Sequence, residues 1–483
     1  GARRRALHRH VAQTLVANGR PGPAAAHYVR SADVGDREAV DALRDALAQA
    51  EARQLHREAI ALLDALLELL PAGDRRWLDI FDAMAVQPEW VVDHRVDAGA
   101  ATGIEAMRRV EALLAGSGDL SRRAAVQFNL SALLGWGMGD IEAAVPLAEE
   151  ARRLFAEAGE VRSELLATNE VGYLSMLGGN FFELGAAALD VLGRAEALGD
   201  PFVALQGLCA LAHFRQYAGV PVESMAVIDR ALALARQEHR LYRVSYLTAQ
   251  QAWSLALLGR MAEAQAQLAD AKAVTPAFRD TLLLDYSIHV HWLAGELGVA
   301  VAGFREQMAW NGAPSRRRTF GAAPAAMCVA EQGDSAGARA ILDLFAGVFQ
   351  DRDWVFYHRD MLPWAGALAA FLSGDDARAW ELLVSSARRM VGQGWGPGPI
   401  GRSALADLGE IAARLGDPAA ALSVTELLDE AGPGPDRGPI DALVLMARGG
   451  AALARKESEE AAEALKAAAP VFEKAGWRLY HGR

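Results

Sequence analysis

Cysteine is scarce in this sequence and long hydrophobic segments are absent from it, and both facts bear on where the protein works. Cys209 and Cys328 are the only cysteines among 483 residues, and each lies in an apolar run with helical spacing. Two thiols so far apart in sequence are more simply interpreted as reduced helix residues than as a disulfide, which indicates a reducing compartment. No apolar run approaches the ~20 residues that cross a bilayer, and Arg3 to Arg5 precede no apolar core of a signal peptide. We therefore expect a cytoplasmic protein without membrane contact.

Lysine is also rare, and the motifs of common enzyme chemistry are missing. A phosphate-binding loop needs Lys directly after Gly, because the loop backbone surrounds the phosphates and the lysine reaches them from its end. None of the lysines follows a glycine; they are Lys272, Lys456, Lys466 and Lys474. No His precedes Glu, no Cys-x-x-Cys occurs, and the GRSAL segment at Gly401 lacks the second glycine of a nucleophile elbow. We expect no catalytic residue, no metal and no cofactor, and hence no enzyme.

Positive charge is in the minority. The 49 Lys and Arg residues are outnumbered by 61 Asp and Glu residues, which leaves a net charge of -12. This sign is unfavourable for contact with nucleic acid or with an anionic membrane surface. We therefore expect no direct nucleic-acid contact by this segment.

Alanine and leucine supply most of the hydrophobic content, which reaches 52% although aromatic residues make up only 7%. Such a composition is typical of helices in close contact. Between Arg240 and Val274, apolar residues recur at three- and four-residue spacing on both sides of Gly259, without Pro. Gly259 supplies the positive φ that ends one helix, and Ala264 is small enough for the next helix to pack closely. This helical hairpin needs a neighbour to cover its other apolar face, as in a solenoid.

The same signature recurs along the chain. A turn residue followed five positions later by Ala occurs at Gly19, Gln54, Gly139, Gly259, Gly295, Gly333, Gly374, Gly416 and Lys456. Gly179 and Gly219 keep the turn with Leu184 and Ser224 in the small position, and Ala101 with Ala106 is the best candidate for a missing unit. The turns from Gly139 to Gly259 are evenly spaced along the sequence. A second small residue precedes the turn by seven positions at Ala132, Gly172, Ala212, Ala252, Ala326, Ala367 and Gly409, with Ile288 as the exception.

Together these features resemble tetratricopeptide repeats with lengthened helices, over nearly the whole chain. The resemblance implies an all-α fold, a right-handed α-solenoid of about 12 TPR-like helical hairpins with a period of about 40 residues. Three connections rich in Gly and Pro interrupt the later repeats, at 311–314, 392–399 and 432–439. Because these residues break helices and form exposed loops, we expect extended, mobile linkers there.

The opening segment carries a narrower resemblance. RRRALHRHVAQTLVANG followed by AAAHYVRSADVGD resembles the junction between the winged-helix part and the superhelical sensor of MalT-like, LuxR-type signal-transduction ATPases, large bacterial transcription regulators. That resemblance implies junction helices at 1–35 after an upstream winged-helix and ATPase region, then a TPR-like sensor or scaffold domain at 36–483. The chain begins with Gly1 and stops at Arg483, where the pattern of another helix starts, so we expect a fragment of a longer protein.

The resemblance also predicts a binding surface. In tetratricopeptide-like solenoids the first helix of each hairpin lines the concave groove with the residues three, six, ten and thirteen positions before the turn. The candidate ligand-binding residues at these positions are Asn129, Trp136, Asn169, Tyr173, Gln206, His213, Gln216, Tyr246, Trp253, Asp285, His289 and Trp292. Amides bind at fixed geometry and aromatic faces stack on rings or peptide groups, so this mixture favours recognition. The alternative is that the rings pack between helices and the histidines are ordinary hydrogen-bonded ones.

These observations leave three functional hypotheses. The first is a sensor that binds a small-molecule or peptide effector in the groove and signals to adjacent ATPase and DNA-binding domains of the same protein. The second is a free-standing scaffold that binds a peptide or protein partner there. The third, an enzyme with an unfamiliar site, requires turnover that depends on His213, Asp285 or His289.

Overall fold

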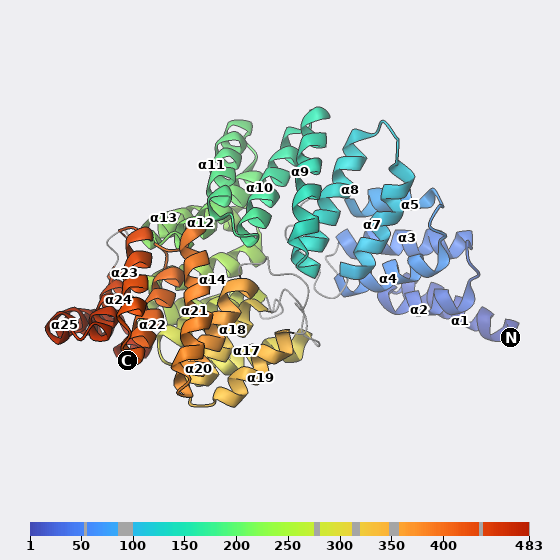
Figure 1. Cartoon of the computed structure of the whole chain (residues 1–483). Coiled ribbons are helices and arrows are strands. Elements are labelled where there is room, and N and C mark those ends of the chain that lie inside the picture. Colours follow the sequence, from blue (N-terminus) through green and yellow to red (C-terminus); the bar gives the residue numbers. More distant parts are fainter. Residues whose placement is uncertain are drawn as a thin grey trace. The chain divides into compact units, whose positions relative to one another are not determined.

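The computed structural model describes residues 1–52, 56–85, 100–274, 281–311, 319–346, 357–433 and 438–482, which contain helices and turns and no strand (Figure 1). Successive helices pair into hairpins, so the predicted all-α solenoid is confirmed. The chain divides into two compact units, Gly1–Val171 and Gly172–Arg483, with the boundary inside one helix. None of the described helices combines the length and the low polarity that a membrane span requires.

Unit 1 is a stack of helices around one hydrophobic core. Its elements are α1 (Ala2–Ala17), α2 (Pro21–Ser31), α3 (Arg37–Ala52), α4 (His56–Leu69), α5 (Arg76–Ala85), α7 (Ala100–Leu114), α8 (Leu120–Ala132), the π-helical η1 (Leu133–Met138), α9 (Ile141–Glu157) and the start of α10 (Val161–Leu177). Ala12 of α1 and Tyr28 of α2 belong to the same core as Leu43, Leu66 and Trp77. The opening hairpin therefore packs as part of the stack of unit 1.

Unit 2 is itself a stack of helical hairpins. Its elements after α10 are α11 (Phe181–Leu198), α12 (Pro201–Tyr217), α13 (Pro221–Gln237), α14 (Leu241–Leu257), α15 (Met261–Val274), α16 (Thr281–Leu293), α17 (Leu297–Asn311), α18 (Thr319–Glu331), α19 (Ser335–Ala346), η3 (Tyr357–Met361), α20 (Leu362–Leu372), α21 (Asp376–Gly392), α22 (Pro399–Leu415), α23 (Pro418–Glu430), α24 (Pro439–Ala454), α25 (Ser458–Ala475) and α26 (Arg478–His481). From α10 to α15, the even-numbered helices are the first members of hairpins and the odd-numbered helices are the second.

The predicted turn residues end their helices with positive φ. This holds for Gly19, Gly139, Gly179, Gly219, Gly259, Gly295, Gly333, Gly374 and Gly416, and also for Lys456 at φ 64°. At Gly259 the amide donates to Ala256 O and the next amide donates to Leu255 O, at 3.0 and 2.9 Å, which is the Schellman pattern. Gln54 lies outside the described residues, and Ala101 lies in the first turn of α7 rather than between helices.

A second series of turns, not predicted from the sequence, connects one hairpin to the next. Gly159, Gly199 and His239 have positive φ and lie midway between the predicted turns, so the turns from Gly139 to Gly259 follow at even intervals. Helices of 17 or 18 residues fill most of each interval. Each repeat in this region is therefore two helices of nearly equal length.

Small residues let the two helices of a hairpin approach closely, as predicted. A Cβ on Gly172 would lie 2.8 Å from the Cβ of Ala187 in α11. Ala212 is fully buried, and its carbonyl oxygen accepts a hydrogen bond of 2.9 Å from the Oγ of Ser224. Serine fits the small position of α13 because its hydroxyl finds this backbone acceptor on the partner helix.

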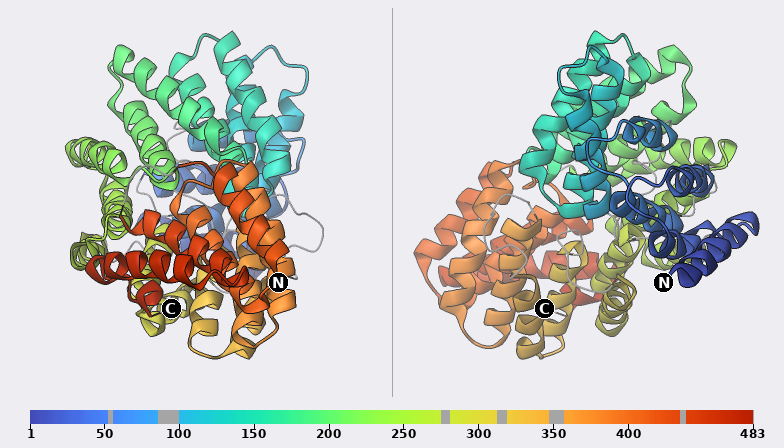
Figure 2. Two further views of the ribbon diagram at one scale, coloured as in Figure 1. Left: turned by 60° about the vertical axis from the view of Figure 1, so that its left-hand side comes forward. Right: turned by 90° about the vertical axis from the view of Figure 1, so that its right-hand side faces the viewer.

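Unit 2 curls until its last helices contact the turns of earlier hairpins. Trp477 Nε1 donates to the carbonyl oxygen of Ala256, 221 positions earlier, at 2.8 Å. A Cβ on Gly259 would lie 2.9 Å from the Cβ of Ala475. Figure 2 shows the red C-terminal helices beside the green helices of the middle of the chain. The turns of these hairpins are therefore covered by the chain itself.

For the connection at 392–399, the sequence interpretation as an exposed linker was wrong. Its composition predicts an exposed, mobile linker, but Trp395 is 1% exposed, and its ring centroid lies 4.6 Å from that of Phe181 and 5.6 Å from that of Tyr217. A Cβ on Gly219 would lie 2.9 Å from the carbonyl oxygen of Pro397. Gly and Pro break the helix here. Because glycine has no Cβ, the connection can nevertheless pack closely between two hairpin turns. Residues 312–314 and 434–437, which are most of the first and half of the second of the other two connections, lie outside the described residues.

Candidate functional site

In unit 1, two of the three predicted binding residues, Trp136 and Asn129, donate hydrogen bonds to other groups of the protein. Trp136 lies in η1, and its Nε1 donates to Glu170 Oε1 of α10 at 2.7 Å. Asn129 Nδ2 donates to the carbonyl oxygen of Ala125 in its own helix at 2.7 Å. Asn169 is 4% exposed, and its Oδ1 accepts no hydrogen bond from the described residues. Of the two asparagines, only Asn169 thus keeps a buried amide oxygen without a donor.

In unit 2, the predicted glutamines join the first helices of two successive hairpins. Gln216 on α12 is fully buried and donates from Nε2 to the backbone oxygen of Gln250 and to Ser254 Oγ on α14, both at 2.8 Å. Gln206 Oε1 accepts from Arg243 NH2, also at 2.8 Å. Because each bond links one repeat to the next, these amides hold neighbouring repeats in register.

The predicted Tyr173, His213 and Tyr246 belong to one aromatic cluster. The ring of Tyr173 lies edge-on to that of His213, with centroids 6.0 Å apart. Tyr286 on α16 places its hydroxyl 3.3 Å from His213 Nδ1 and its ring 6.1 Å from that of Tyr246. The cluster therefore continues across four successive first helices, α10, α12, α14 and α16.

Trp253, His289 and Trp292 meet around a small internal space deeper in unit 2. The rings of Trp253 and His289 are 5.2 Å apart, and Trp292 lies 6.2 Å from Trp364 and 6.0 Å from Tyr480. The space they line has a volume of about 10 Å³, which is room for about one water molecule. Trp292 Nε1 has no hydrogen-bond partner in the described part of the chain. This space is too small for an effector in the present conformation.

The predicted residues of unit 2 thus form a continuous but buried inner layer. Their exposed fractions are 9% for Tyr173, 8% for His213 and His289, and 4% or less for Gln206, Gln216, Tyr246, Trp253 and Trp292. The side chain of Asp285 lies outside the described part. Side chains of this layer contact one another across hairpins, so a role in ligand binding, which stays a prediction, requires the layer to open.

A buried carboxyl group adjoins this layer. Trp364 Nε1 donates to Asp407 Oδ2 at 2.8 Å, and Asp407 is 2% exposed. Burial raises the pKa of Asp407 well above its usual range, and the nearby Glu410 adds to the effect, while the bond from Trp364 opposes it. The environment therefore favours the neutral acid, which can both donate and accept a hydrogen bond.

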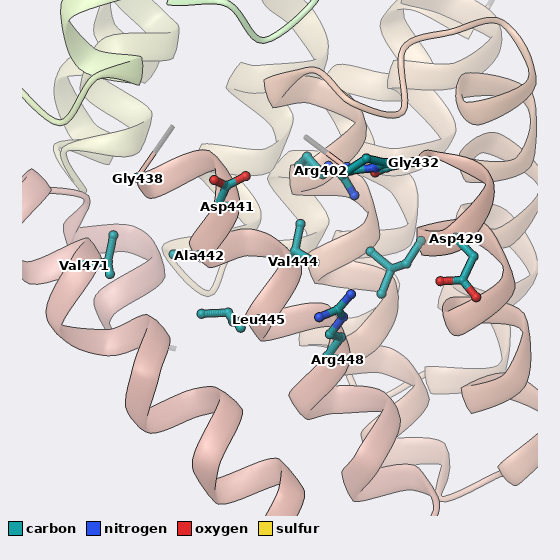
Figure 3. A pocket seen from close by; sticks show the side chains of 12 residues that line it. Arg402, Asp429, Gly432, Gly438, Asp441, Ala442, Val444, Leu445, Arg448 and Val471 are labelled. Carbon is teal, nitrogen blue, oxygen red and sulfur yellow. The ribbon is translucent and has the colours of Figure 1, made fainter. Parts of the chain in front are cut away.

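A cavity of ligand size lies elsewhere in unit 2, between α22, α23, α24 and α25 (Figure 3). Its volume is about 660 Å³, within the ~300–1,000 Å³ typical of small-molecule sites. Its apolar lining comes from Leu428, Pro433, Ala442, Val444, Leu445 and Val471. Four charged side chains, Arg402, Asp429, Asp441 and Arg448, complete the lining.

Close helix packing borders the cavity. A Cβ on Gly409 of α22 would lie 2.7 Å from the carbonyl oxygen of Ala447, and a Cβ on Gly450 would overlap the carbonyl group of Gly409. The two first helices thus touch backbone to backbone at these glycines. The cavity lies beside this contact and is lined by Arg402 of α22 and by residues of α24 from Asp441 to Arg448.

Arg402 is the unusual residue of this site. It is 2% exposed, its NH2 donates to the carbonyl oxygen of Gly432, and its Nε has no hydrogen-bond partner among the described residues. Burial lowers the pKa of Arg402, although the charge of Asp441 opposes that effect. A buried guanidinium without a bonded carboxylate is unfavourable unless a ligand completes its contacts.

Arg402 lies outside the set that the sequence predicted, because that set came only from positions counted back from hairpin turns in the middle of the chain. The available signal was an arginine within the apolar run from Ile400 to Leu408. A charge at such a position must be buried or paired when the helix packs. Arg402 lies in the GRSAL segment, and the nucleophile-elbow pattern that this segment partly matches assigns no role to an arginine at its position.

Metal binding finds no support in the described ranges. They contain no group of three or more His, Cys, Asp or Glu side chains placed to hold an ion. Cys209 and Cys328 are both buried thiols.

Comparison with known proteins does not reveal a family. No family model matches the chain, and no curated protein matches it. Two solved structures align over most of it at 13% identity: "Structure of Naa15/Naa10 bound to HypK-THB", covering 99% of this chain and 79% of that one with a TM-score of 0.19, and "Circular tandem repeat protein with novel repeat topology and enhanced subunit contact surfaces", covering 93% and 90% with a TM-score of 0.14. Similarity at this level carries no argument about what the chain binds.

Proposed function

We propose that this chain is a non-catalytic effector-binding segment of a bacterial transcription regulator, and that the effector is a small molecule that binds between hairpins of unit 2. The observation that carries the proposal is the cavity of about 660 Å³ beside the buried Arg402. Its size suits a small ligand, and its mixture of apolar walls with a few charged groups is typical of ligand sites. The inner layer around Trp253 offers only a small fraction of that space.

The regulator role is supported by the sequence resemblance. The opening segment and the length of the hairpins resemble the sensor part of LuxR-type signal-transduction ATPases. In such a protein the partners would be the adjacent ATPase and DNA-binding domains of the same polypeptide. The predicted inner layer would then transmit the signal rather than bind the effector directly.

Helix α22 provides a physical route for that transmission. Arg402 lines the cavity, whereas its neighbours Pro399, Ile400 and Ser403 line the small space beside Trp253 and Trp292. A ligand that moves α22 must therefore change the packing of the aromatic layer. Because a solenoid is held by contacts between neighbours, a small change at one hairpin alters the stacking of the next. The effector must prefer one packing by a few kcal/mol to shift the population.

The first experiment asks whether a small molecule occupies the cavity. Purified protein is analysed by native mass spectrometry for a bound compound, which is then added back to ligand-free protein in calorimetry. Leu445→Trp fills the cavity and should abolish binding, whereas Leu422→Trp, at a position 58% exposed on α23, is the matched control. Equal affinity in both variants would exclude the cavity as the binding site.

The alternative is a free-standing scaffold for a protein partner. Large apolar side chains exposed on the second helices favour it, among them Phe182 at 62%, Leu189 at 57% and Val222 at 57%. Exposed apolar groups can mark an interaction surface. The coding sequence on either side separates the two hypotheses, because a regulator requires a P-loop module upstream and a helix-turn-helix downstream.

A further inference from the structure

The charged side chains of the cavity differ in whether a nearby group of the protein already compensates their charge. Asp441 lies in the first turn of α24, where a carboxylate interacts favourably with the amino-terminal end of the helix dipole. Arg448, on the same helix, makes no hydrogen bond or ion pair with any residue that the structure describes. Arg402 donates to a neutral carbonyl oxygen, which leaves its charge without a bonded counter-ion in the described ranges. The unmatched charge at this site is therefore positive.

The two arginines come from different helices and share one space. Arg402 extends from α22 and Arg448 from α24, with Val444 and Leu445 beside them, as the close-up shows (Figure 3). Asp429, the remaining acidic residue, is exposed on α23, where water solvates its charge. Arginine binds carboxylate and phosphate groups well because its planar guanidinium presents N–H groups in a fixed fork that matches two of their oxygens.

We propose that the cavity binds a small organic anion, whose carboxylate or phosphate group is held by Arg402 and Arg448 and whose apolar body packs against Leu428, Val444 and Leu445. This inference rests on the proposed function, because it names the chemical class of the effector for the same site. The anion supplies the acceptor that Arg402 Nε lacks, and it compensates the burial of a positive charge. The lowered pKa of Arg402 agrees with a guanidinium that is buried without a bound counter-ion.

The test compares probes that share an alkyl body and differ in the head group. Octanoate, octyl phosphate, octanamide and octylamine are titrated into the full chain by calorimetry, with thermal unfolding as a second readout. Octanoate or octyl phosphate should bind and raise the melting temperature, and the stronger of the two identifies the oxyanion. Binding of octanamide or octylamine as tightly as both anions would overturn the proposal, as would no binding of either anion at millimolar concentration.

Substitutions of the two arginines test whether these side chains bind the anion. Arg402→Met should weaken binding of the anion by at least about tenfold, since it removes hydrogen bonds to a charged group, and Arg448→Gln should weaken it less because that side chain is exposed. Arg388→Gln, the same change at an exposed position of α21, is the control and should leave the affinity unchanged. Where Arg402→Met does not fold, Arg402→Lys keeps the charge and loses the fork, so it should still reduce affinity. Unchanged affinity in both the Arg402 and Arg448 variants would refute the assignment.

Failure of the inference is distinguishable from failure of the proposed function. A neutral compound that binds the wild type and is excluded by Leu445→Trp would keep the cavity as the effector site and reject the anion. An anion that binds equally to Leu445→Trp and to the wild type would reject the cavity itself.

Discussion

The contact between α22 and α24 allows a sharp test of the packing argument. Gly409 and Gly450 bring the two helices together without side chains, and a Cβ on Gly450 would lie 2.9 Å from the Cα of Gly409 and overlap its carbonyl group. Carbon atoms in ordinary contact are ~3.5–4.0 Å apart. Gly450→Ala therefore requires the helices to separate by roughly 1 Å, which weakens their dispersion contacts.

The expected size of the effect follows from two opposing contributions. Overpacking a well-packed core typically costs ~1–3 kcal/mol, and backbone atoms move less easily than side chains. Replacing Gly by Ala inside a helix favours folding by ~1 kcal/mol. We expect a net loss of about 2 kcal/mol for Gly450→Ala, since the clash involves backbone and lies at the upper end of the overpacking range.

The matched control is an exposed glycine on a helix. Gly193 lies in α11, where a Cβ would meet nothing within 4 Å, so Gly193→Ala should raise stability by up to ~1 kcal/mol. Urea unfolding followed by circular dichroism at 222 nm measures both variants, and amide hydrogen exchange of α22 and α24 locates the change. A Gly450→Ala variant as stable as the wild type, together with a stabilised Gly193→Ala, would refute the reasoning.

Three further predictions concern buried groups of unit 2. The pKa of Asp407 is raised above its ordinary value of 3.8, so its contribution to stability is full below that pH and is lost as the pH rises. Asp407→Asn keeps an acceptor for Trp364 and removes the titrating group. The decline of the urea midpoint between pH 4 and pH 8 should therefore be flatter in this variant than in the wild type. Trp477→Ala removes a fully buried indole and its hydrogen bond to α14, and should lower the unfolding free energy by ~3–5 kcal/mol in denaturant titration. A loss below about 1 kcal/mol would mean that this contact does not hold unit 2 closed. Burial raises the pKa of Cys328 to about 12, so Ellman's reagent should react with neither Cys328 nor Cys209 in the native protein and with both in denaturant; fast native labelling would contradict the closed packing.

The sequence by itself determined the hairpins. A helix ends where a residue must adopt positive φ, and two helices approach where both carry small side chains, so Gly259, Ala264 and Ser224 reveal local structure without knowledge of the fold. The turns at His239 and Gly199 were missed: Val244 rather than Ala follows His239 by five residues, and Ala204, which follows Gly199 by five residues, was not recognised as the same signature. These are local rules of backbone conformation and helix packing, and the residues that follow them recur at the period of the repeat.

Only the tertiary structure decided what those hairpins enclose. Trp477 contacts Ala256, and Trp395 contacts Phe181, although the members of each pair belong to distant repeats, and such pairings leave no periodic trace. These long-range contacts bury the inner layer, which was predicted from the sequence to line an open groove. They also place the Gly- and Pro-rich connection at 392–399 in the core. Arg402 became a candidate site because α22 and α24 touch at glycines and leave a cavity beside them, and that depends on how helices far apart in the chain meet.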